Sequence, residues 1–467
     1  MTLRALVLCF AAAGAVGCGG ARTANPDAGR SEVYRAGEPD FDLEAVSSVR
    51  DAQTGADVAL SLPQASLIYR RDGDSYIADV RWSVQVRTTN GTPLDALSWE
   101  EAIRVPSLAA TRTFEPIVRT RRLDLAPAVV RVTAVVVRVT AVVEDLATAR
   151  TARREVTLSV EDPDSAPALG GLRLAVIRDT AVVPLVSRSA VRFRGALQAS
   201  AQATGIADGS LATVRVLRLR ADSSVAEPPS AFTPMRSSLV SIGIDLAATD
   251  TVFADTQVLR QPAAAIQIEA PLPALPEGTF RIELGVAEGL GREPLAQVHR
   301  VLTVRRADFP ALVRIGDLIG PLAYIATESE LAEIRSARGA FAQRAAFDRF
   351  WGTLTADRRV AASTLRAFYE RAEEANRLYS THKPGWATDR GMISVMFGPP
   401  ELVERRLDEE TWVFGAGSLL PSVTFDRTAS RELDGVPYDV FTLRRSPAYD
   451  RAWRAARRRW RSGVVPG

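Results

Sequence analysis

The sequence contains almost no lysine or histidine, and each scarcity excludes a class of site. Lys383 is the one lysine among 58 basic residues, and it does not follow the glycine-rich run of a Walker A loop. The two histidines, His299 and His382, are too far apart for the HExxH motif of zinc proteases. The GxSxG, CxxC and GxGxxG motifs are also absent. We therefore expect no catalytic residue, no metal site and no cofactor.

Long apolar runs are also missing, except at the N-terminus. Residues 5–17 follow the positive Arg4 and form an apolar run that is too short to span a bilayer and matches the core of a secretion signal. Small residues precede Cys18, as in proteins that are lipidated on a cysteine and cleaved before it. We therefore expect residues 1–17 to be a signal peptide and Cys18 to carry lipid. The alternative is an ordinary cleaved signal with a chance cysteine.

Cysteine usage agrees with this interpretation. Of the two cysteines, Cys9 leaves with the signal peptide, so the mature chain keeps only Cys18 and has no internal disulfide. We expect a lipid-anchored protein of the cell envelope, at the outer membrane or on the periplasmic face, that contacts the membrane through this lipid. The formal charge of +3 is small for 467 residues. It gives no reason to expect a nucleic-acid partner, and the exported address argues against one.

The mature chain is too long for a single hydrophobic core. Residues 18–42, rich in Gly, Ala, Pro and Asp, are expected to be the lipidated cysteine and a flexible tether. Residues 43–165 contain short runs that alternate between apolar and polar positions, best seen from Tyr76 to Arg87, separated by turn residues. Residues 166–306 show the same pattern. We therefore predict two β-sandwich domains of the immunoglobulin or fibronectin type III kind.

Two local features of this region depart from the regular strand pattern. The heptapeptide VVRVTAV occupies residues 129–135 and recurs at residues 136–142. Because seven is odd, a single straight strand would turn the two copies to opposite faces, so one copy is expected in a bulge, a bend or an edge loop. The acidic stretch at residues 161–164 resembles a calcium loop, but it lacks the EF-hand spacing and is interpreted as a linker.

The pattern changes to helical spacing after about residue 307, so residues 307–467 are predicted to be an α+β domain. Thr327 and Glu330 form a capping box before one helix, and residues 365–379 show one apolar face of a second. Five of the seven tryptophans lie in residues 351–467, which indicates an aromatic core. We predict strands at residues 391–397, 410–414, 422–426 and 438–443, and a basic helix at the end of the chain.

Residues 384–401 read PGWATDRGMISVMFGPPE. Gly385, Trp386, Thr388 and Asp389 match a Gly-Trp-x-Thr-Asp motif, followed by Arg390, Gly391 and the turn Gly398-Pro399-Pro400. This segment resembles the GWxTD domain of exported bacterial proteins, and the likeness extends over roughly residues 310–445. The resemblance implies an α+β domain behind β-sandwich modules, often on a lipoprotein. The family has no assigned reaction.

The motif admits a structural and a functional interpretation. In the first, Gly385 permits an unusual backbone conformation, Trp386 buries its ring, and Thr388 and Asp389 accept backbone N–H bonds within the turn. Arg390 then pairs with Asp389 or Glu401. In the second, the loop from Gly385 to Gly391 and the Gly398-Pro399-Pro400 turn form a recognition surface. An acid–base pair of His382 and Asp389 is a further alternative.

The last helix carries Trp453, Ala456 and Trp460 on one face and arginines over the rest. This pattern fits either an aromatic stripe packed on the domain or an amphipathic helix on anionic lipid. Taken together, the sequence favours a non-catalytic envelope lipoprotein that acts as a binding or structural module for an unknown envelope protein or glycan. The alternative is an envelope enzyme with an acid–base site at the GWATDRG loop.

Overall fold

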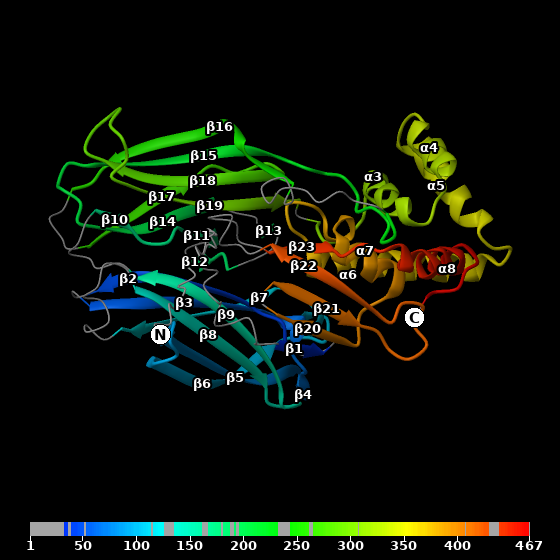
Figure 1. Ribbon diagram of the computed structural model, residues 1–467, viewed down its shortest axis with the longest axis horizontal. Coiled ribbons are helices and arrows are strands. Elements are labelled where there is room, and N and C mark those ends of the chain that lie inside the picture. Colours follow the sequence, from blue (N-terminus) through cyan, green and yellow to red (C-terminus); the bar gives the residue numbers. More distant parts are fainter. Residues whose placement is uncertain are drawn as a thin grey trace, which may run out of the picture.

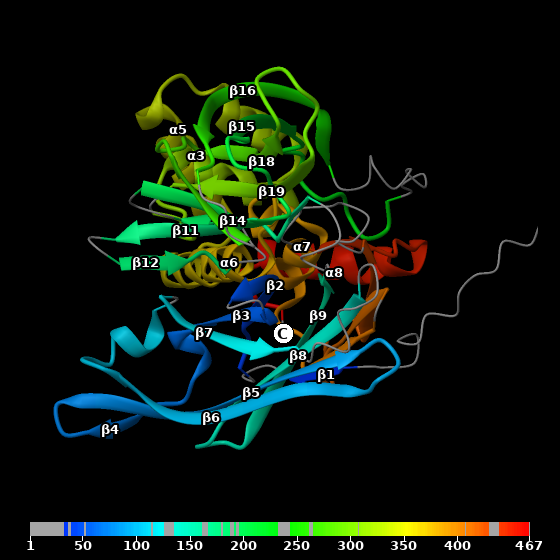
Figure 2. The same ribbon diagram turned by 90° about the vertical axis from the view of Figure 1, so that its left-hand side faces the viewer.

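Strands fill the first two thirds of the chain, and the α-helices of the described residues all follow residue 314 (Figures 1 and 2). The structure is a computed structural model. It describes residues 32–35, 39–50, 53–113, 115–125, 135–160, 167–178, 181–186, 191–192, 196–231, 243–260, 265–306, 308–406, 408–428 and 439–466. The predicted signal peptide, Cys18, the acidic stretch 161–164 and most of the first repeat copy lie outside these residues. The expected fold class, β-sandwiches followed by an α+β domain, is confirmed.

The first sandwich packs a three-stranded sheet, β2-β3-β7, on a five-stranded sheet, in which β5 pairs with β4, β6 and β8, and β8 with β9. The alternation predicted from Tyr76 to Arg87 falls in β5, whose Val80, Trp82 and Val84 are fully buried between the sheets. The strands are β2 (Asp42–Arg50), β3 (Gln53–Pro63), β4 (Arg70–Asp72), β5 (Ser75–Thr88), β6 (Pro93–Val105), β7 (Pro116–Asp124), β8 (Val135–Asp145) and β9 (Arg150–Val160).

The second copy of the heptapeptide repeat, residues 136–142, lies within β8, between β5 and β9. Val137, Val139 and Ala141 point into the core, whereas Arg138 lies on the other face and pairs with Glu155 at 2.7 Å. This copy is therefore part of a central strand. The other copy, residues 129–135, lies mostly outside the described residues, so the bulge, bend or edge loop expected for one copy stays a prediction.

The second sandwich packs a sheet in which β14 pairs with β10, β11 and β17, and β11 with β12, on the sheet β13-β19-β18-β15-β16. Phe280, Ile282 and Leu284 on β18 are fully buried, in line with their alternation in the sequence. The strands are β10 (Ala168–Leu169), β11 (Arg173–Arg178), β12 (Ala181–Pro184), β13 (Val191–Arg192), β14 (Ala196–Thr204), β15 (Leu211–Ala221), β16 (Ile244–Val258), β17 (Ala265–Leu272), β18 (Gly278–Ala287) and β19 (Ala296–Arg305).

The two sandwiches lie one above the other at the left of Figure 1, joined by polar contacts. Arg300 of β19 pairs with Glu44 of β2 at 2.8 Å, and Arg173 of β11 pairs with Asp57 of β3 at 2.7 Å. Gln202 of β14 donates to and accepts from the backbone of Val49. Each sandwich has its own apolar core, so the two domains are held together by polar contacts and not by a shared core.

The C-terminal domain lies at the right of Figure 1 and combines helices with the five-stranded sheet β1-β20-β21-β22-β23. Its core is the aromatic cluster expected from the tryptophan content, with Trp412, Trp460 and Phe368 fully buried. The elements are β1 (Glu32–Arg35), α3 (Ile315–Ile319), α4 (Glu328–Ser336), α5 (Ala340–Thr353), α6 (Arg358–Tyr379), α7 (Asp389–Phe397), β20 (Leu402–Arg405), β21 (Glu409–Val413), β22 (Ser422–Thr428), β23 (Val440–Leu443) and α8 (Asp450–Arg461).

One predicted strand of this domain is wrong, because residues 391–397 belong to helix α7. All residues from Gly391 to Phe397 are buried, so the segment shows none of the polar and apolar spacing that identifies a helix at a protein surface. The N-cap settles its conformation: the hydroxyl of Thr388 accepts a hydrogen bond from the amide of Gly391 at 3.1 Å. The capping box of Thr327 and Glu330 on α4 is confirmed.

Part of the predicted tether is folded. Residues 32–35 form β1, which pairs antiparallel with β20 of the C-terminal domain, and Phe41 is buried in the core of the first sandwich. Arg154 of β9 pairs with Asp40, between these two points. The segment from residue 32 to residue 41 therefore connects the C-terminal sheet to the first sandwich. None of the helices that the structure describes is both long and apolar enough to cross a bilayer.

Candidate functional site

The GWATDRG loop joins two helices inside the C-terminal domain. Helix α6 ends at Tyr379, the 3-10 turn Gly385–Ala387 follows, and α7 begins at Asp389. Gly385, Trp386, Ala387 and Gly391 are buried. The motif residues therefore lie mostly beneath the surface, and their contacts are with the rest of the chain.

Gly385 and Gly391 are explained by close packing of backbone on backbone. A Cβ atom on Gly385 would lie 1.8 Å from the carbonyl oxygen of Ala375 on α6, and a Cβ on Gly391 would lie 1.8 Å from the carbonyl oxygen of Gly385. Neither glycine has a positive φ, so the expectation that Gly385 supplies an unusual backbone conformation is wrong. The two glycines let α6, the motif turn and α7 approach one another more closely than any side chain allows.

Trp386 fixes the turn to the start of the domain. Trp386 is 9% exposed, and its ring lies edge-on to Tyr324 with centroids 6.3 Å apart. A Cβ on Gly320 would lie 2.6 Å from the same indole ring. The Tyr324 hydroxyl donates to the carbonyl of Trp386 at 2.7 Å, and the amide of Trp386 donates to the side chain of Asn376 at 3.3 Å. The backbone carbonyl and amide of Trp386 are thus both held, by the segment before α4 and by α6 respectively.

Thr388 contacts residues close to it in the sequence, whereas Asp389 contacts residues far along the chain. The Thr388 hydroxyl accepts from the amide of Gly391 at 3.1 Å, as the structural interpretation expects of a residue that ties the turn. It also donates to the carbonyl of Gly385 at 2.7 Å and is the N-cap of α7, a role that the sequence did not predict. Asp389 instead accepts two hydrogen bonds from the Arg445 guanidinium, at 2.6 and 3.1 Å, and one from the amide of Leu443 at 2.8 Å. The side chains of Asp389 and Arg445 are 11% and 10% exposed. Asp389 therefore ties α7 to the end of β23.

Arg390 does not pair with Asp389 or Glu401. It lies 3.6 Å from the buried carboxylate of Glu410, and its guanidinium stacks on Phe441 at 3.9 Å from the ring centroid. Trp412 donates to Glu410 at 2.6 Å, and Arg405 does so at 3.2 Å. Burial acts to raise the pKa of Glu410, but Arg390 and Arg405 outweigh it and hold the pKa below its ordinary value. The carboxylate is therefore charged and satisfied within the sheet.

The Gly398-Pro399-Pro400 turn ends α7. Gly398 has a φ of 92°, which favours glycine, and its amide donates to the carbonyl of Ser394 at 2.9 Å. A Cβ there would lie 3.2 Å from the Arg371 guanidinium. Pro399 is exposed and Pro400 is buried. Of the turn, Pro399 is the residue that remains accessible to a partner.

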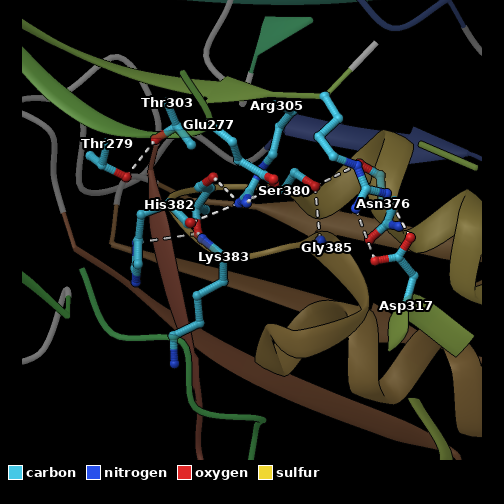
Figure 3. Close-up of polar contacts among 12 residues, drawn as sticks. Glu277, Thr279, Thr303, Arg305, Asp317, Asn376, Ser380, His382, Lys383 and Gly385 are labelled. Carbon is cyan, nitrogen blue, oxygen red and sulfur yellow. Dashed lines mark hydrogen bonds and ion pairs between the residues drawn. The ribbon is translucent and has the colours of Figure 1, made fainter. Parts of the chain in front are cut away.

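His382 and Lys383 occupy the junction with the second sandwich (Figure 3). Arg305, at the end of β19, donates to the carbonyl of His382 at 2.7 Å. Lys383 pairs with Asp222 and donates to the carbonyl and hydroxyl oxygens of Ser224 at 2.9 and 3.0 Å. Burial, followed by the charge of Lys383, lowers the pKa of His382 to about 3, so its imidazole is neutral near pH 7. The only lysine of the chain thus serves a contact between domains.

A segment of the second sandwich also crosses the motif itself. The amide of Ala226 donates to the carbonyl of Ala387 at 3.0 Å. Arg445, the partner of Asp389, donates to the carbonyl of Glu227 at 3.1 Å, and the amide of Ser446 donates to the carbonyl of Pro229 at 3.0 Å. The motif therefore holds together parts of the C-terminal domain and also contacts the segment that follows β15.

Sequence reasoning missed Arg445 and Glu410, the charged partners of the motif. Both are distant along the chain from the motif residues they contact, Asp389 and Arg390, and nothing in their local sequence marks them. The hypothesis of a His382–Asp389 pair does not fit the contacts of Asp389, whose two carboxylate oxygens accept from Arg445 and Leu443, whereas a Cβ on Gly243 would lie 2.9 Å from Nε2 of His382. Within the described residues, no three side chains of His, Cys, Asp or Glu gather as metal ligands would.

One small hollow lies away from the motif, in the second sandwich. It has a volume of about 20 Å³ and is lined by Val214, Gln257, Ile268 and Leu284 among others. A space of this size holds about one water molecule. It therefore offers no room for a substrate.

Residues 291–462 match the family model of the GWxTD domain, so the chain contains this domain, as the motif indicated. A search of curated proteins found no match. Among solved structures, the chain is similar to a red sea bream transglutaminase, with 11% identity over 57% of this chain and 31% of that chain, and a TM-score of 0.17.

The α2-macroglobulins of Salmonella and E. coli also show similarity, at 11% and 10% identity. The matched regions cover 58% and 57% of this chain but only 17% and 16% of the two macroglobulin chains. The TM-score is 0.19 in both cases. The chain thus spans less than a third of the length of these three proteins. At such scores the likeness supports no conclusion about fold or function.

Proposed function

We propose that the protein is a non-catalytic lipoprotein of the cell envelope, a binding or structural module in which the GWxTD motif serves as an internal junction. The observation that carries this proposal is that the polar groups of the motif bind other parts of the same chain. Thr388, Asp389 and Arg390 all make contacts within the chain, and Asp389 and Arg445 are about nine-tenths buried together. A buried charge pair of this kind is costly to open, because each partner would be left without a counter-charge.

The position of the motif supports a structural role as well. It contacts α6, α7, β23 and the segment that follows β15, so a change there affects the junction between two domains. The surfaces that remain for a partner are then the outer faces of the sheets and helices. We propose that an envelope protein or glycan binds one of these surfaces, without a metal or a cofactor.

The lipid anchor is the part of the proposal that rests on sequence alone. Cys18 follows a signal-like segment and is the only cysteine that the mature chain keeps. The first described strand, β1, begins 14 residues after Cys18, so the intervening chain is long enough to serve as a tether.

Replacement of Cys18 tests the proposed address. In the native organism, a Cys18→Ser variant should take up no radiolabelled fatty acid and should move from the membrane fraction to the soluble fraction, since the lipid is the proposed attachment. Cys9→Ser is the matched control and should be labelled and fractionated like the wild type. A wild-type protein without label, in a membrane fraction that Cys18→Ser does not leave, would show the proposed anchor to be wrong.

A second experiment tests the non-catalytic role against the enzyme alternative. His382→Ala and Asp389→Ala would each abolish function in a fully folded protein if the two residues formed an acid–base site. On our proposal, loss of function follows loss of stability in both variants, because both side chains serve the junction. Thermal melts beside a complementation assay distinguish the two patterns.

A further inference from the structure

Helix α8 turns its aromatic side chains into the domain. Trp453 and Trp460 are buried, with Trp460 fully so, and Nε1 of Trp460 donates to the carbonyl of Met396 at 3.2 Å. Trp453 lies edge-on to Tyr324, with centroids 6.1 Å apart. The apolar face of this helix is therefore occupied by its own domain and does not insert into lipid.

The opposite face of α8 carries arginines for which no hydrogen bond or ion pair to another described element of the domain is present. Arg451, Arg454 and Arg458 are spaced by three and four residues, so they form one outward row, and Arg459 lies at its flank. All four are exposed. Within the described residues, the side chains of Arg451, Arg458 and Arg459 make no hydrogen bond or ion pair, whereas Arg454 pairs with Asp450.

The other two arginines of the helix have a structural role. Arg457 donates to the carbonyls of Ile325 and Ala326, and Arg461 pairs with Glu330 at 2.8 Å. These inward contacts attach α8 to the start of α4. The outward arginines make no such contact with another element of the domain, since Arg454 pairs with Asp450 of the same helix, so the packing of the domain does not account for their charge.

The tether enters the fold on the same domain. The first described residue, Glu32, begins β1, which pairs with β20 in the C-terminal sheet. The residues between Cys18 and Glu32 reach about 45 Å when extended, at roughly 3.3 Å per residue. Figure 1 shows α8 on the outside of this domain, towards the end of the molecule away from the sandwiches. A chain of this length allows the outward face of α8 to rest on the membrane that holds the anchor.

We propose that the outward arginine row of α8, formed by Arg451, Arg454 and Arg458 and flanked by Arg459, docks on an anionic lipid surface. The proposal extends the lipoprotein function, since the anchor would bring this face to the bilayer. The charge is complementary to phosphate headgroups, and each arginine near such a surface contributes about 1 kcal/mol, or about fivefold in affinity. Val464 and Val465, which are half exposed just beyond the helix, add apolar area at the same end.

The test uses the chain from residue 19 to residue 467, which keeps every described residue and cannot be lipidated on Cys18. Sedimentation with vesicles should show binding to phosphatidylglycerol vesicles at low salt and little binding to pure phosphatidylcholine. The variant R451Q/R458Q/R459Q should bind phosphatidylglycerol about a hundredfold more weakly, from three losses of about fivefold each. High salt should weaken the wild type strongly, because it screens the attraction.

The matched control is R220Q/R260Q/R292Q, which removes the same charge from exposed positions of the second sandwich. It should bind within about twofold of the wild type, because these residues belong to the second sandwich and not to the arginine row of α8. Equal losses in both variants, no preference for phosphatidylglycerol, or equal affinity for duplex DNA at the same salt would each overturn the proposal. Because this chain lacks Cys18, an absence of vesicle binding would not contradict the proposed lipid anchor. Likewise, a negative result with Cys18→Ser would not change the interpretation of the vesicle experiment.

Discussion

The GWATDRG loop and helix α8 lie in one domain, and both are rich in polar and aromatic residues, but they use them in opposite ways. The loop turns its charged groups inward, where Asp389 meets Arg445 and Arg390 meets Glu410. Helix α8 turns its tryptophans inward and leaves Arg451, Arg458 and Arg459 in solvent. A conspicuous motif can thus mark an internal junction, whereas an unremarkable run of arginines can mark the accessible surface. Substitutions in the loop should therefore change stability, and those on α8 should change binding.

The largest effect is expected at the two motif glycines. Gly385→Ala and Gly391→Ala each place a Cβ 1.8 Å from a backbone carbonyl oxygen, and backbone cannot move aside as a side chain can. We expect a loss of more than about 4 kcal/mol in the free energy of unfolding, or no folded domain. Urea unfolding measures this loss.

Gly352→Ala is the control for these variants. Gly352 lies within α5, and a Cβ there has no heavy atom within 4 Å. The substitution should be neutral or should stabilise by up to about 1 kcal/mol, because alanine is the better helix former. If Gly385→Ala were as stable as Gly352→Ala, the close approach of α6 and the motif turn would be refuted.

The next effect concerns Trp386 and the glycine beneath it. Trp386→Ala should cost about 3–5 kcal/mol, since a large buried ring is removed. Gly320→Ala alone should cost about 1–3 kcal/mol, because its Cβ meets the indole ring at 2.6 Å. In the Trp386→Ala background the same Gly320→Ala change should cost almost nothing, since the space is empty. Additive losses in this double-mutant cycle would show that the ring does not pack on Gly320.

Between pH 6.5 and pH 5, a smaller effect that depends on pH is expected from His382. Its pKa is about 3 in the folded chain and about 6.5 in the unfolded chain, so the unfolded state binds a proton first as the pH falls. The stability that neutral His382 contributes is therefore complete above pH 6.5 and is lost progressively down to about pH 3, by about 1.4 kcal/mol per pH unit. Asp222, Lys383 and Arg305 face the same junction and retain their charges over the upper part of this range.

His382→Gln should remove this dependence, so its unfolding free energy should fall less steeply than that of the wild type between pH 6.5 and pH 5. Comparison of the two proteins cancels the titration of groups elsewhere. Parallel curves for the two proteins would mean that His382 is accessible to protons in the folded state, and that the junction is more open than the contacts indicate.

The smallest effect is expected on α8. R451Q/R458Q/R459Q should change the free energy of unfolding by less than about 0.5 kcal/mol, as is usual for exposed side chains without partners. Thermal melts at several salt concentrations measure it. A loss of more than about 2 kcal/mol would show that the outward arginines stabilise the domain, and the contrast with the motif loop would disappear.

Much of the fold could be predicted from local patterns. The alternation from Tyr76 to Arg87 identified β5, and the capping box of Thr327 and Glu330 identified the start of α4, because both patterns are set by neighbours within a few residues. Helix α7 was mistaken for a strand, because a helix buried on all sides has no polar face to reveal its period.

The candidate site could be located by its sequence but not explained by it. The motif identified which residues are unusual and that Thr388 ties the turn, but not that Thr388 caps a helix, because the segment after it was predicted to be a strand. The partner of Asp389 is Arg445, and β1 pairs with β20 from the opposite end of the chain. Such pairings depend on the packing of whole domains, which a single sequence does not encode in any local pattern.

We interpret the motif as an internal junction whose charged groups pair with other residues inside the protein. A double-mutant cycle between Asp389 and Arg445 tests this interpretation most directly. Asp389→Ala and Arg445→Ala should each lower the free energy of unfolding by about 3 kcal/mol, because each leaves a largely buried charge unpaired. The double variant should lose much less than the sum, with a coupling energy of about 2 kcal/mol. Additive changes in the free energy of unfolding, with Asp389→Ala as stable as the wild type, would contradict this interpretation. Asp389 would then be an accessible residue that is available for function.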